Sequence, residues 1–552
     1  MRASANAAAA DLVIEAERIH TFDDEGSEHR ALAVRDGRII ALGDSRDDLA
    51  GLIGGATRVV DCRDTVLTPG FFDTHNHQLH TARNLNAVDL DGATAIADVV
   101  DALARRARET PPGEWIVSSS TWHETNLRER RLPVARELDR ATSSHPVCVH
   151  RGGHVRVANS EALRLAGITA SSPDPPGGTI VREAGGTPNG QLIEFAAFES
   201  LERLLPVPSF EADVASLGRV CRRYNERGLI AVRDPGLGRD QMLVYQALRD
   251  TGGLTIWSRL MVRVPPTLDR AAKLAEIASW GVRTGFGDDL LRIDGVKLVA
   301  DGGVEGGALS EPYANDAGYR GHLMTSADEL AEVASAAVDR GWRVGTHAVG
   351  DVAVRTVLDA YERVRRRFPE LPPGWLTIEH AFFADAVQRR RAIDLGVSIT
   401  VQHPLLYALG GNMVVYWGEA RTAEVFPLRE WVEEGALVAA GTDSGPAPWD
   451  PLLSIWGMVT RGTRVAGRPG PGHAIDRRTA WWLYTVAGAR LFGDGDVRGD
   501  LSIGRLADLV AFPRDPLTCP IDDLPALRPA FTLLSGAPVF DAEGRLAGGG
   551  VR

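Results

Sequence analysis

Apolar runs and amphipathic stretches alternate along the middle of the chain. Eight apolar runs are typical of buried strands, and helical patterns such as Phe210 to Arg227 and Val352 to Phe368 lie between them. The runs centre on residues 68–77, 230–234, 256–262, 293–301, 343–347, 376–380, 398–402 and 437–443. Strand and helix alternating eight times predicts an α/β fold, a (β/α)8 TIM barrel, with functional residues at the carboxyl ends of its strands.

Both ends of the chain show shorter strand patterns. These patterns cover residues 11–16, 31–34 and 38–42 near the start, and residues 507–512, 531–534 and 537–540 near the end. Asp36-Gly37 supplies a hairpin turn signal in the first set. Two half-sheets at opposite ends of one chain predict a composite β-sandwich domain of residues 1–67 and 497–552. The barrel then occupies residues 68–496.

A long connection follows the first predicted barrel strand. It forms an insertion of about residues 111–205, which contains a Gly/Pro-rich run from 171 to 190. Long insertions in a barrel usually serve its functional site. The candidate substrate-binding residues of this insertion are Trp122, Glu124, Arg151 and His154. Trp122 could instead anchor the insertion, and His154 is either a catalytic contact to the substrate or a hydrogen-bonded structural histidine.

Composition and charge narrow the range of partners. The chain has 552 residues, enough for one large barrel with accessory parts, and its net charge of -12 argues against nucleic acid and anionic membranes. Four cysteines are far apart and form no metal or redox spacing, which suits a reducing compartment. The first ten residues lack the apolar core of a signal peptide. We therefore expect a cytoplasmic enzyme with a small-molecule substrate. Because barrels of this type often pair, we also expect a homodimer.

Six side chains suited to metal binding stand at or near the ends of the predicted strands. They are His75, His77, Lys297, His347, His380 and Asp443. Side chains alternate along a strand, so the His-x-His pair presents both imidazoles on one side, where they could hold one cation. A carboxylate after an apolar run, as at Asp443, is costly unless it is paired or bound to a metal. Each histidine alone could be a buried core residue. Their shared position at strand ends favours a metal site.

Lys297 is unusual because the chain uses arginine almost everywhere else. Only Lys273 and Lys297 are lysines among 61 basic residues. Burial lowers the pKa of a lysine and exposes a neutral, nucleophilic amine, which a guanidinium cannot supply. Such an amine could add CO2 and become a carbamate that bridges two cations. The alternative is a lysine that pairs with Asp294 or Asp301.

Several motifs together resemble the metal-dependent amidohydrolase superfamily, and within it the long-chain amidohydrolase family 3, which includes N-substituted formamide deformylases. The resemblance runs nearly end to end. It rests on Pro-Gly-Phe-Phe-Asp-Thr-His-Asn-His from Pro69, Val-Lys-Leu around Lys297, Thr-His-Ala-Val-Gly-Asp from Thr346, Ile-Glu-His from Ile378 and Gly-Thr-Asp from Gly441. The family reads Trp-Asp-Glu and Arg-x-Asp-Gly-His within the insertion. His123 and Gly153 depart from these patterns.

The ligand set implies a hydrolytic mechanism. One cation would be held by His75, His77 and carboxylated Lys297, and a second by the same carbamate, His347 and His380. Asp443 would bind the first cation, accept a proton from the activated water and pass it to the leaving nitrogen. Zinc fits these ligands best, with iron, manganese or cobalt also compatible, and one or two ions per chain.

The resemblance implies cleavage of carbon–nitrogen bonds other than peptide bonds, with an N-formyl or N-acyl amine as substrate. Phe382, Gln402 and Trp449 join the candidate substrate-binding residues from the later loops. Three alternatives remain. The substrate could be a cyclic amide, carbamate or lactone. The reaction could be an isomerisation or deamination. The chain could also be a non-catalytic metal-binding or regulatory member of the family.

Overall fold

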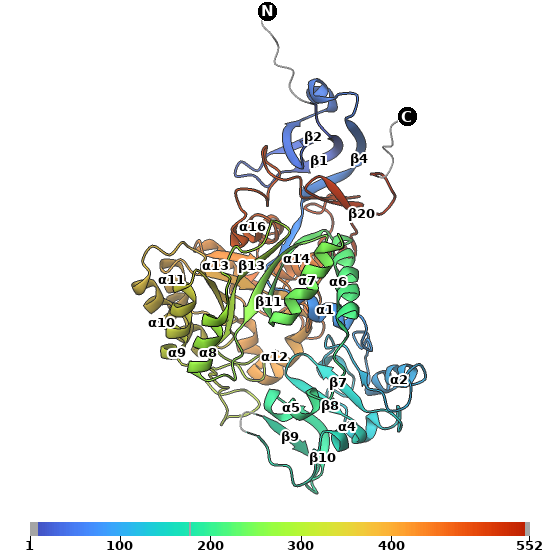
Figure 1. Ribbon diagram of the computed structural model, residues 1–552, viewed down its shortest axis with the longest axis vertical. Helices are drawn as coiled ribbons and strands as arrows, with labels where there is room; N and C mark the ends of the chain where they lie inside the picture. The colour runs from blue at the N-terminus through green and yellow to red at the C-terminus, as the bar shows by residue number, and fades with distance from the viewer. Residues whose placement is uncertain (1–8, 176–177, 547–552) are drawn as a thin grey trace, which may run out of the picture.

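The computed structural model describes residues 9–175 and 178–546 and contains three sheets (Figure 1). The largest is an eight-stranded parallel sheet in the order β17-β16-β15-β14-β13-β12-β11-β5. Its strands are β5 (Phe71–Asp73), β11 (Leu229–Leu237), β12 (Trp257–Arg263), β13 (Leu291–Val299), β14 (Arg343–Ala348), β15 (Leu376–His380), β16 (Ser398–Val401) and β17 (Leu437–Ala440). The predicted TIM barrel is therefore confirmed. The prediction for residues 1–8 lies outside the described residues.

Helices cover the outside of the barrel and follow its strands in order. They are α1 (Gln78–Asn84), α6 (Phe210–Asn225), α7 (Arg239–Asp250), α8 (Arg270–Ser279), α9 (Ala327–Asp339), α10 (Asp351–Arg367), α11 (Ala386–Asp394), α12 (His403–Ala423), α13 (Leu428–Glu433), α14 (Pro451–Thr460), α15 (Arg477–Tyr484) and α16 (Val486–Phe492). Side-chain oxygens of Ser209, Asp269 and Ser326 cap α6, α8 and α9. One large apolar cluster fills the space between strands and helices.

The first and last barrel strands are joined beyond their ends. The backbone N–H of Thr74 donates to the carbonyl of Ala440, and the N–H of Asp443 donates to the carbonyl of His75 at 2.7 Å. The buried carboxylate of Asp73 accepts hydrogen bonds from both the N–H and the hydroxyl of Thr442. These contacts bring the chain after β17 against the chain after β5, where two of the predicted ligands lie.

The two ends of the chain contribute strands to one accessory sheet, where the sequence predicted a composite β-sandwich. It has the order β20-β19-β18-β4-β1-β2-β3. Its strands are β1 (Leu12–His20), β2 (Glu28–Arg35), β3 (Arg38–Gly43), β4 (Arg58–Pro69), β18 (Leu509–Phe512), β19 (Phe531–Leu534) and β20 (Ala537–Asp541). The seven strands belong to a single hydrogen-bonded sheet, and short 3-10 helices at Arg46–Leu52 and Ile521–Ala526 accompany it. β4 leads directly into β5, so this sheet supports the start of the barrel.

The segment between α1 and α6, which contains the predicted insertion and begins earlier with α2, folds around its own sheet. Its strands, in the order β6-β7-β8-β10-β9, are β6 (Ile116–Val117), β7 (Val147–Arg151), β8 (Val155–Ala158), β9 (Thr179–Arg182) and β10 (Pro188–Ile193). Its helices are α2 (Ile96–Ala107), α3 (Ala135–Leu138), α4 (Ser160–Leu165) and α5 (Phe195–Glu202). Figure 1 places it at the opposite end of the molecule from the accessory sheet. Within the described residues, no helix is long and apolar enough to cross a membrane.

Candidate metal centre and active site

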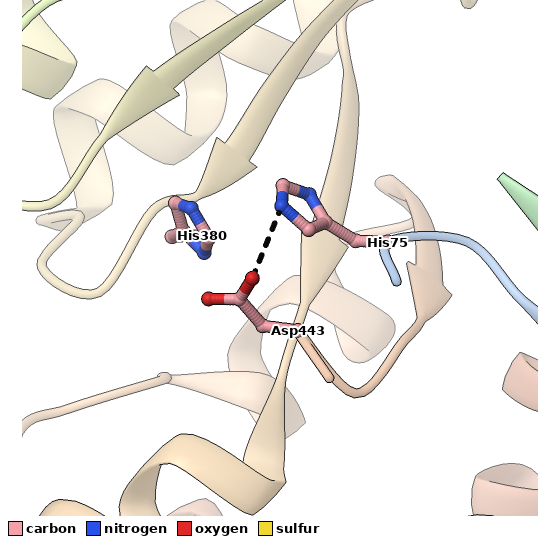
Figure 2. A group of neighbouring side chains, drawn as sticks. All are labelled: His75, His380 and Asp443. Carbon is pink, nitrogen blue, oxygen red and sulfur yellow. Dashed lines mark ion pairs between the residues drawn. The ribbon is translucent and has the colours of Figure 1, made fainter. Parts of the chain in front are cut away.

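Three of the predicted ligands form a compact buried group at the mouth of the barrel. Donor atoms of His75, His380 and Asp443 all lie within 4.8 Å of one another (Figure 2). His75 follows β5, His380 ends β15 and Asp443 follows β17. His77 adds a fourth side chain, because its Nε2 atom lies 3.1 Å from Oδ1 of Asp443.

The donor atoms of this group fit a divalent cation. His75 Nε2 and Asp443 Oδ1 are buried and lie 3.5 Å apart; Nε2 has no hydrogen-bond partner within the described part of the chain, and Oδ1 also lies 3.1 Å from His77 Nε2. Burial lowers the pKa of His75 to about 4 and that of His380 well below its usual value, so both rings are neutral and offer a lone pair. Burial opposes ionisation of Asp443, but His77, His75 and His380 hold its pKa below the usual range. Two imidazoles and one carboxylate suit zinc.

The backbone at two of these ligands is strained. His380 has a φ of 79° and Asp443 a φ of 55°, in the left-handed region that L-residues with side chains seldom adopt. Ala381, next to His380, also has a positive φ of 44°. Such residues persist only where the surroundings over-determine them, and they cluster at functional sites. Here the strain directs both side chains into the mouth of the barrel.

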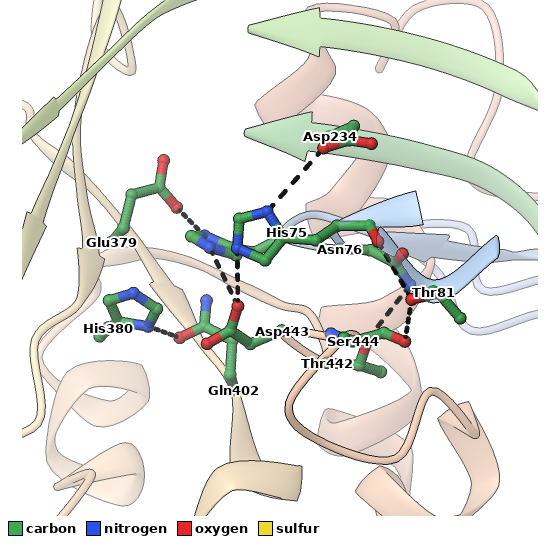
Figure 3. Close-up of polar contacts among 12 residues, drawn as sticks. His75, Asn76, Thr81, Asp234, Glu379, His380, Gln402, Thr442, Asp443 and Ser444 are labelled. Carbon is green, nitrogen blue, oxygen red and sulfur yellow. Dashed lines mark hydrogen bonds and ion pairs between the residues drawn. The ribbon is translucent and has the colours of Figure 1, made fainter. Parts of the chain in front are cut away.

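Residues behind the ligands fix their ring orientations (Figure 3). Nδ1 of His75 lies 2.7 Å from Oε2 of Glu379, and Nδ1 of His380 lies 2.7 Å from Oε1 of Gln402. The Thr400 hydroxyl joins the two supports, since it donates to Glu379 and accepts from Gln402. With both Nδ1 atoms occupied, the Nε2 atoms are left for a metal. These contacts make Gln402 an orienting partner of His380.

A row of buried charges continues below Glu379 inside the barrel. Arg233 donates to Oε1 of Glu379 at 2.5 Å and lies 3.6 Å from Asp294, which in turn accepts from Arg343 at 2.7 Å. The charges of Arg233 and Lys297 hold the pKa of Glu379 well below its usual value, although burial opposes its ionisation. Glu379 is therefore a carboxylate, and it favours the His75 tautomer with a proton on Nδ1.

Lys297 is buried in β13, beside this row of charges. Burial lowers the pKa of its amine to about 8, while Glu379 and Asp443 act in the opposite direction. Neither alternative partner is engaged with it: Asp294 pairs with two arginines, and Asp301 accepts three backbone N–H groups. A buried amine of lowered pKa has the reactivity that carbamate formation requires.

His347 lies next to the compact group but is not part of it. Its ring is centred 4.6 Å from the ring of His380. Its Nε2 atom lies 3.1 Å from the carbonyl oxygen of Gly302, in the loop that follows β13. Nε2 of His347 is therefore occupied in this geometry, and Nδ1 is the nitrogen left for a metal.

The insertion reaches the site through Arg151 and its two carboxylate partners. Arg151 pairs with Glu124 at 2.9 Å and with Glu305, which lies in the loop after β13. Asn412 of α12 also donates to Glu124 at 2.8 Å. Because its donors are directed at these two carboxylates, Arg151 joins the insertion to the barrel.

Packing contacts account for the positions of three side chains, Trp122, His123 and Trp449. Trp122 is buried in the apolar cluster of the insertion and donates to the carbonyl of His150 at 2.6 Å, which is how an anchor would behave. Trp449 lies against Tyr224 with ring centres 5.0 Å apart. His123 is fully buried, and burial lowers its pKa to about 3.

Phe382 packs beside a candidate ligand, and His154 pairs with a carboxylate of the insertion. Phe382 follows His380, with ring centres 5.9 Å apart, and packs on Trp417 and Phe426. His154 pairs through Nδ1 with Glu194 at 3.0 Å. The sequence pattern did not identify Glu379, Arg233, Glu305 or Glu194. Glu379 alone had a visible signal, as a charged residue inside a buried strand directly before a ligand.

The barrel, with a buried group of histidines and an aspartate at the carboxyl ends of its strands, is the arrangement of a metal-dependent hydrolase. The family model for the amidohydrolase family matches residues 58–540, and the chain belongs to this family. It is 28% identical to N-substituted formamide deformylase of Arthrobacter pascens over 97% of this chain and 99% of that protein. It is 27% identical to the putative amidohydrolase YtcJ of Bacillus subtilis over 95% and 98%.

A solved structure shares the whole architecture. An uncharacterized metal-dependent hydrolase from Pyrococcus horikoshii matches with a TM-score of 0.73 and 26% identity, over 93% of this chain and 99% of that one. The insertion and the accessory sheet therefore belong to the shared fold.

Proposed function

We propose that the protein hydrolyses the carbon–nitrogen bond of an N-formyl or N-acyl amine. The observation that carries the proposal is the buried pair of His75 Nε2 and Asp443 Oδ1, which face each other next to His380, with His75 Nε2 lacking a hydrogen-bond partner among the described residues. The similarity to an N-substituted formamide deformylase supports an amide as the substrate. A divalent cation held there would supply Lewis acidity and a nucleophile at neutral pH.

Asp443 is the proposed proton carrier. Its carboxylate lies between His75 and His77 and is ionised, so it can accept a proton from water as water attacks the carbonyl carbon. The proton then passes to the nitrogen, the carbon–nitrogen bond breaks, and the products are a carboxylic acid and an amine. His154, Phe382 and Glu305 would surround the substrate.

Lys297 and His347 are proposed to complete a second ligand set. Lys297 would do so as a carbamate, which needs the neutral amine that its lowered pKa of about 8 makes available. His347 would have to release the carbonyl of Gly302 or use its other nitrogen. The metal content therefore distinguishes one-ion from two-ion forms, and both are compatible with Asp443 as proton carrier.

The test compares the unaltered protein with Asp443→Asn. Each is purified without chelators in the presence of bicarbonate, loaded with zinc and assayed on N-formyl amines, N-acyl amines, cyclic amides and lactones. We expect turnover of an acyclic amide, with kcat falling by about 10²–10⁴-fold in the variant because a general base is lost. KM should change by only a few-fold.

Mass-spectrometric metal analysis of the same samples gives the control. Asp450→Asn, which alters a helix-capping aspartate of α14, should retain both metal and turnover. If the protein turned over lactones and no amide, the proposed substrate class would be wrong and the protein would be a lactone hydrolase. A zinc-loaded protein that turns over none of the panel would favour the non-catalytic alternative.

A further inference from the structure

The contact between His154 and Glu194 has the geometry of an oriented dyad. Glu194 Oε2 lies 3.0 Å from Nδ1 of His154, and the Glu194 backbone N–H donates to the His154 carbonyl at 2.8 Å. The ring of Phe195 meets the imidazole edge-on, with centres 5.8 Å apart. One hydrogen bond and one ring contact therefore hold the imidazole of His154 from the side of α5, and the backbone hydrogen bond ties the two chain segments together.

Glu194 holds this position at a conformational cost. Its φ of 65° and ψ of 156° place it in a region occupied almost only by glycine. Strain of this kind costs on the order of 1–3 kcal/mol and occurs mainly at functional sites. A residue needed only for the fold at this point would be glycine. The presence of a glutamate here indicates that its carboxylate is used.

The free side of the dyad faces the loop that follows β13. Nε2 of His154 has no hydrogen-bond partner within residues 9–175 and 178–546, and a Cβ atom placed on Gly303 would lie only 3.0 Å from it. The neighbouring Gly302 carbonyl is the group that contacts His347. His154 and His347 therefore face the same short loop, which brings the insertion to the metal site.

A second glycine makes room for the carboxylate. A Cβ atom on Gly306 would lie 3.3 Å from Oε1 of Glu194, an atom that is buried without a hydrogen-bond partner among the described residues. Tyr319 approaches the same point, with its hydroxyl 4.0 Å from that Cβ position. Both members of the dyad thus lie against glycines of the 302–306 loop.

We propose that Glu194 is a positioning residue that holds the His154 imidazole with Nε2–H directed at the substrate carbonyl oxygen. This inference rests on the proposed hydrolysis. As water adds to the carbonyl carbon, that oxygen gains negative charge, and a hydrogen bond from a cationic imidazole stabilises it. No bond to His154 forms or breaks.

The electrostatic surroundings support a charged imidazole. Burial opposes the charge on His154, but Glu194 raises its pKa above 6.5, and Glu305 adds to this effect while Arg151 opposes it. Two further titratable groups on this side are uncharged: burial lowers the pKa of His347 to about 3 and raises that of Tyr319 to about 12. The cation is thus favoured below the raised pKa, and it is lost as the pH rises through that value.

The experiment uses zinc-loaded protein with three substitutions: Glu194→Gln, Glu194→Gly, and Glu199→Gln as a control on the exposed side of α5. Histidine labelled with ¹³C at Cε1 reports the titration of His154, assigned by its loss in His154→Gln. We expect the midpoint to fall in Glu194→Gln. The alkaline limb of kcat/KM should move to lower pH with it, and kcat should drop by about 10-fold. Glu199→Gln should match the unaltered protein.

Glu194→Gly separates positioning from a structural role. Glycine relieves the strained backbone but removes the carboxylate, so the melting temperature should stay equal or rise while kcat falls. An equal loss of stability and activity would overturn the inference. So would an unchanged His154 midpoint in Glu194→Gln. If the unaltered protein turns over no substrate, the proposed function fails, and the His154 midpoint alone still decides the dyad.

Discussion

At the scale of single residues, the support of one proposed metal ligand extends through a buried carboxylate to a buried guanidinium. His75 is held by Glu379, and Glu379 by Arg233, whose side chain is 1% exposed. Removing one partner of a buried pair leaves the other charge uncompensated. In Arg233→Met, Glu379 therefore becomes costly to keep ionised, and its hold on the His75 ring weakens.

We predict that Arg233→Met lowers zinc affinity by about 10–100-fold, the usual effect of losing a group behind a metal ligand. Competition with a fluorescent chelator measures this affinity. Arg227→Met is the matched control, because Arg227 is also buried and paired, with Asp450, but supports no ligand. It should lose stability and keep its zinc affinity. Equal zinc affinities in all three proteins would contradict the prediction.

Some residues of the candidate site could be predicted from the sequence, and others could not. His75, His380 and Asp443 could be predicted because ligand-type side chains close apolar runs at strand ends. Arg233 and Glu194 could not, because their roles depend on partners that are 146 and 40 residues away. Charge alone does not show which buried carboxylate an arginine will meet.

At the scale of elements, β14 shows how a strand makes room for the groups behind the metal. Gly345 pairs in register with Lys297 on one side and with Thr377 on the other. A Cβ atom at Gly345 would lie 2.5 Å from Oε1 of Glu379 and 2.8 Å from the terminal methyl of Met261. A glycine in a buried strand is otherwise unfavourable, so this one marks a close approach.

We predict that Gly345→Ala displaces the Glu379 carboxylate and lowers zinc affinity together with kcat. Overpacking of this kind typically costs about 1–3 kcal/mol of stability. Gly281→Ala is the control, since a Cβ atom there meets nothing within 4 Å and its φ is not strained. Calorimetry measures the stability of both variants, and zinc titration measures their zinc affinity. A Gly345→Ala protein that is less stable but has normal zinc affinity would show that Glu379 does not move.

Element boundaries were less predictable than element types. The run at residues 68–77 was predicted as one barrel strand, yet it is divided at Gly70 between β4 of the accessory sheet and β5 of the barrel. An apolar run shows only that its residues are buried. Which sheet they join depends on β18, which pairs with β4 from the far end of the chain.

At the scale of the whole molecule, the candidate metal site brings together the ends of three barrel strands that are not neighbours in the sheet. The trio follows β5, ends β15 and follows β17, and two of its members carry strained backbone. The accessory sheet lies at the opposite end of the barrel from the insertion (Figure 1). Metal binding should therefore stabilise one end of the molecule selectively.

We predict that chelation lowers the melting temperature and increases hydrogen exchange at residues 380–384 and 441–445, while strands β1–β4 keep their protection. A ligand that binds only the folded state contributes about 2.7 kcal/mol when present at 100 times its Kd, and that contribution is lost on its removal. Without it, the positive-φ residues at the ends of β15 and β17 have less to hold them in place.

Hydrogen-exchange mass spectrometry of the zinc-loaded and chelated protein measures this directly, and the accessory sheet serves as the internal control. Protection should return when zinc is added back, and Asp443→Asn should show a smaller difference between the two states because one ligand is missing. A uniform change along the chain would mean that the metal stabilises the fold globally. An unchanged exchange rate at 441–445 would mean that Asp443 is held by the contacts around β5 and β17 alone, with no contribution from a cation.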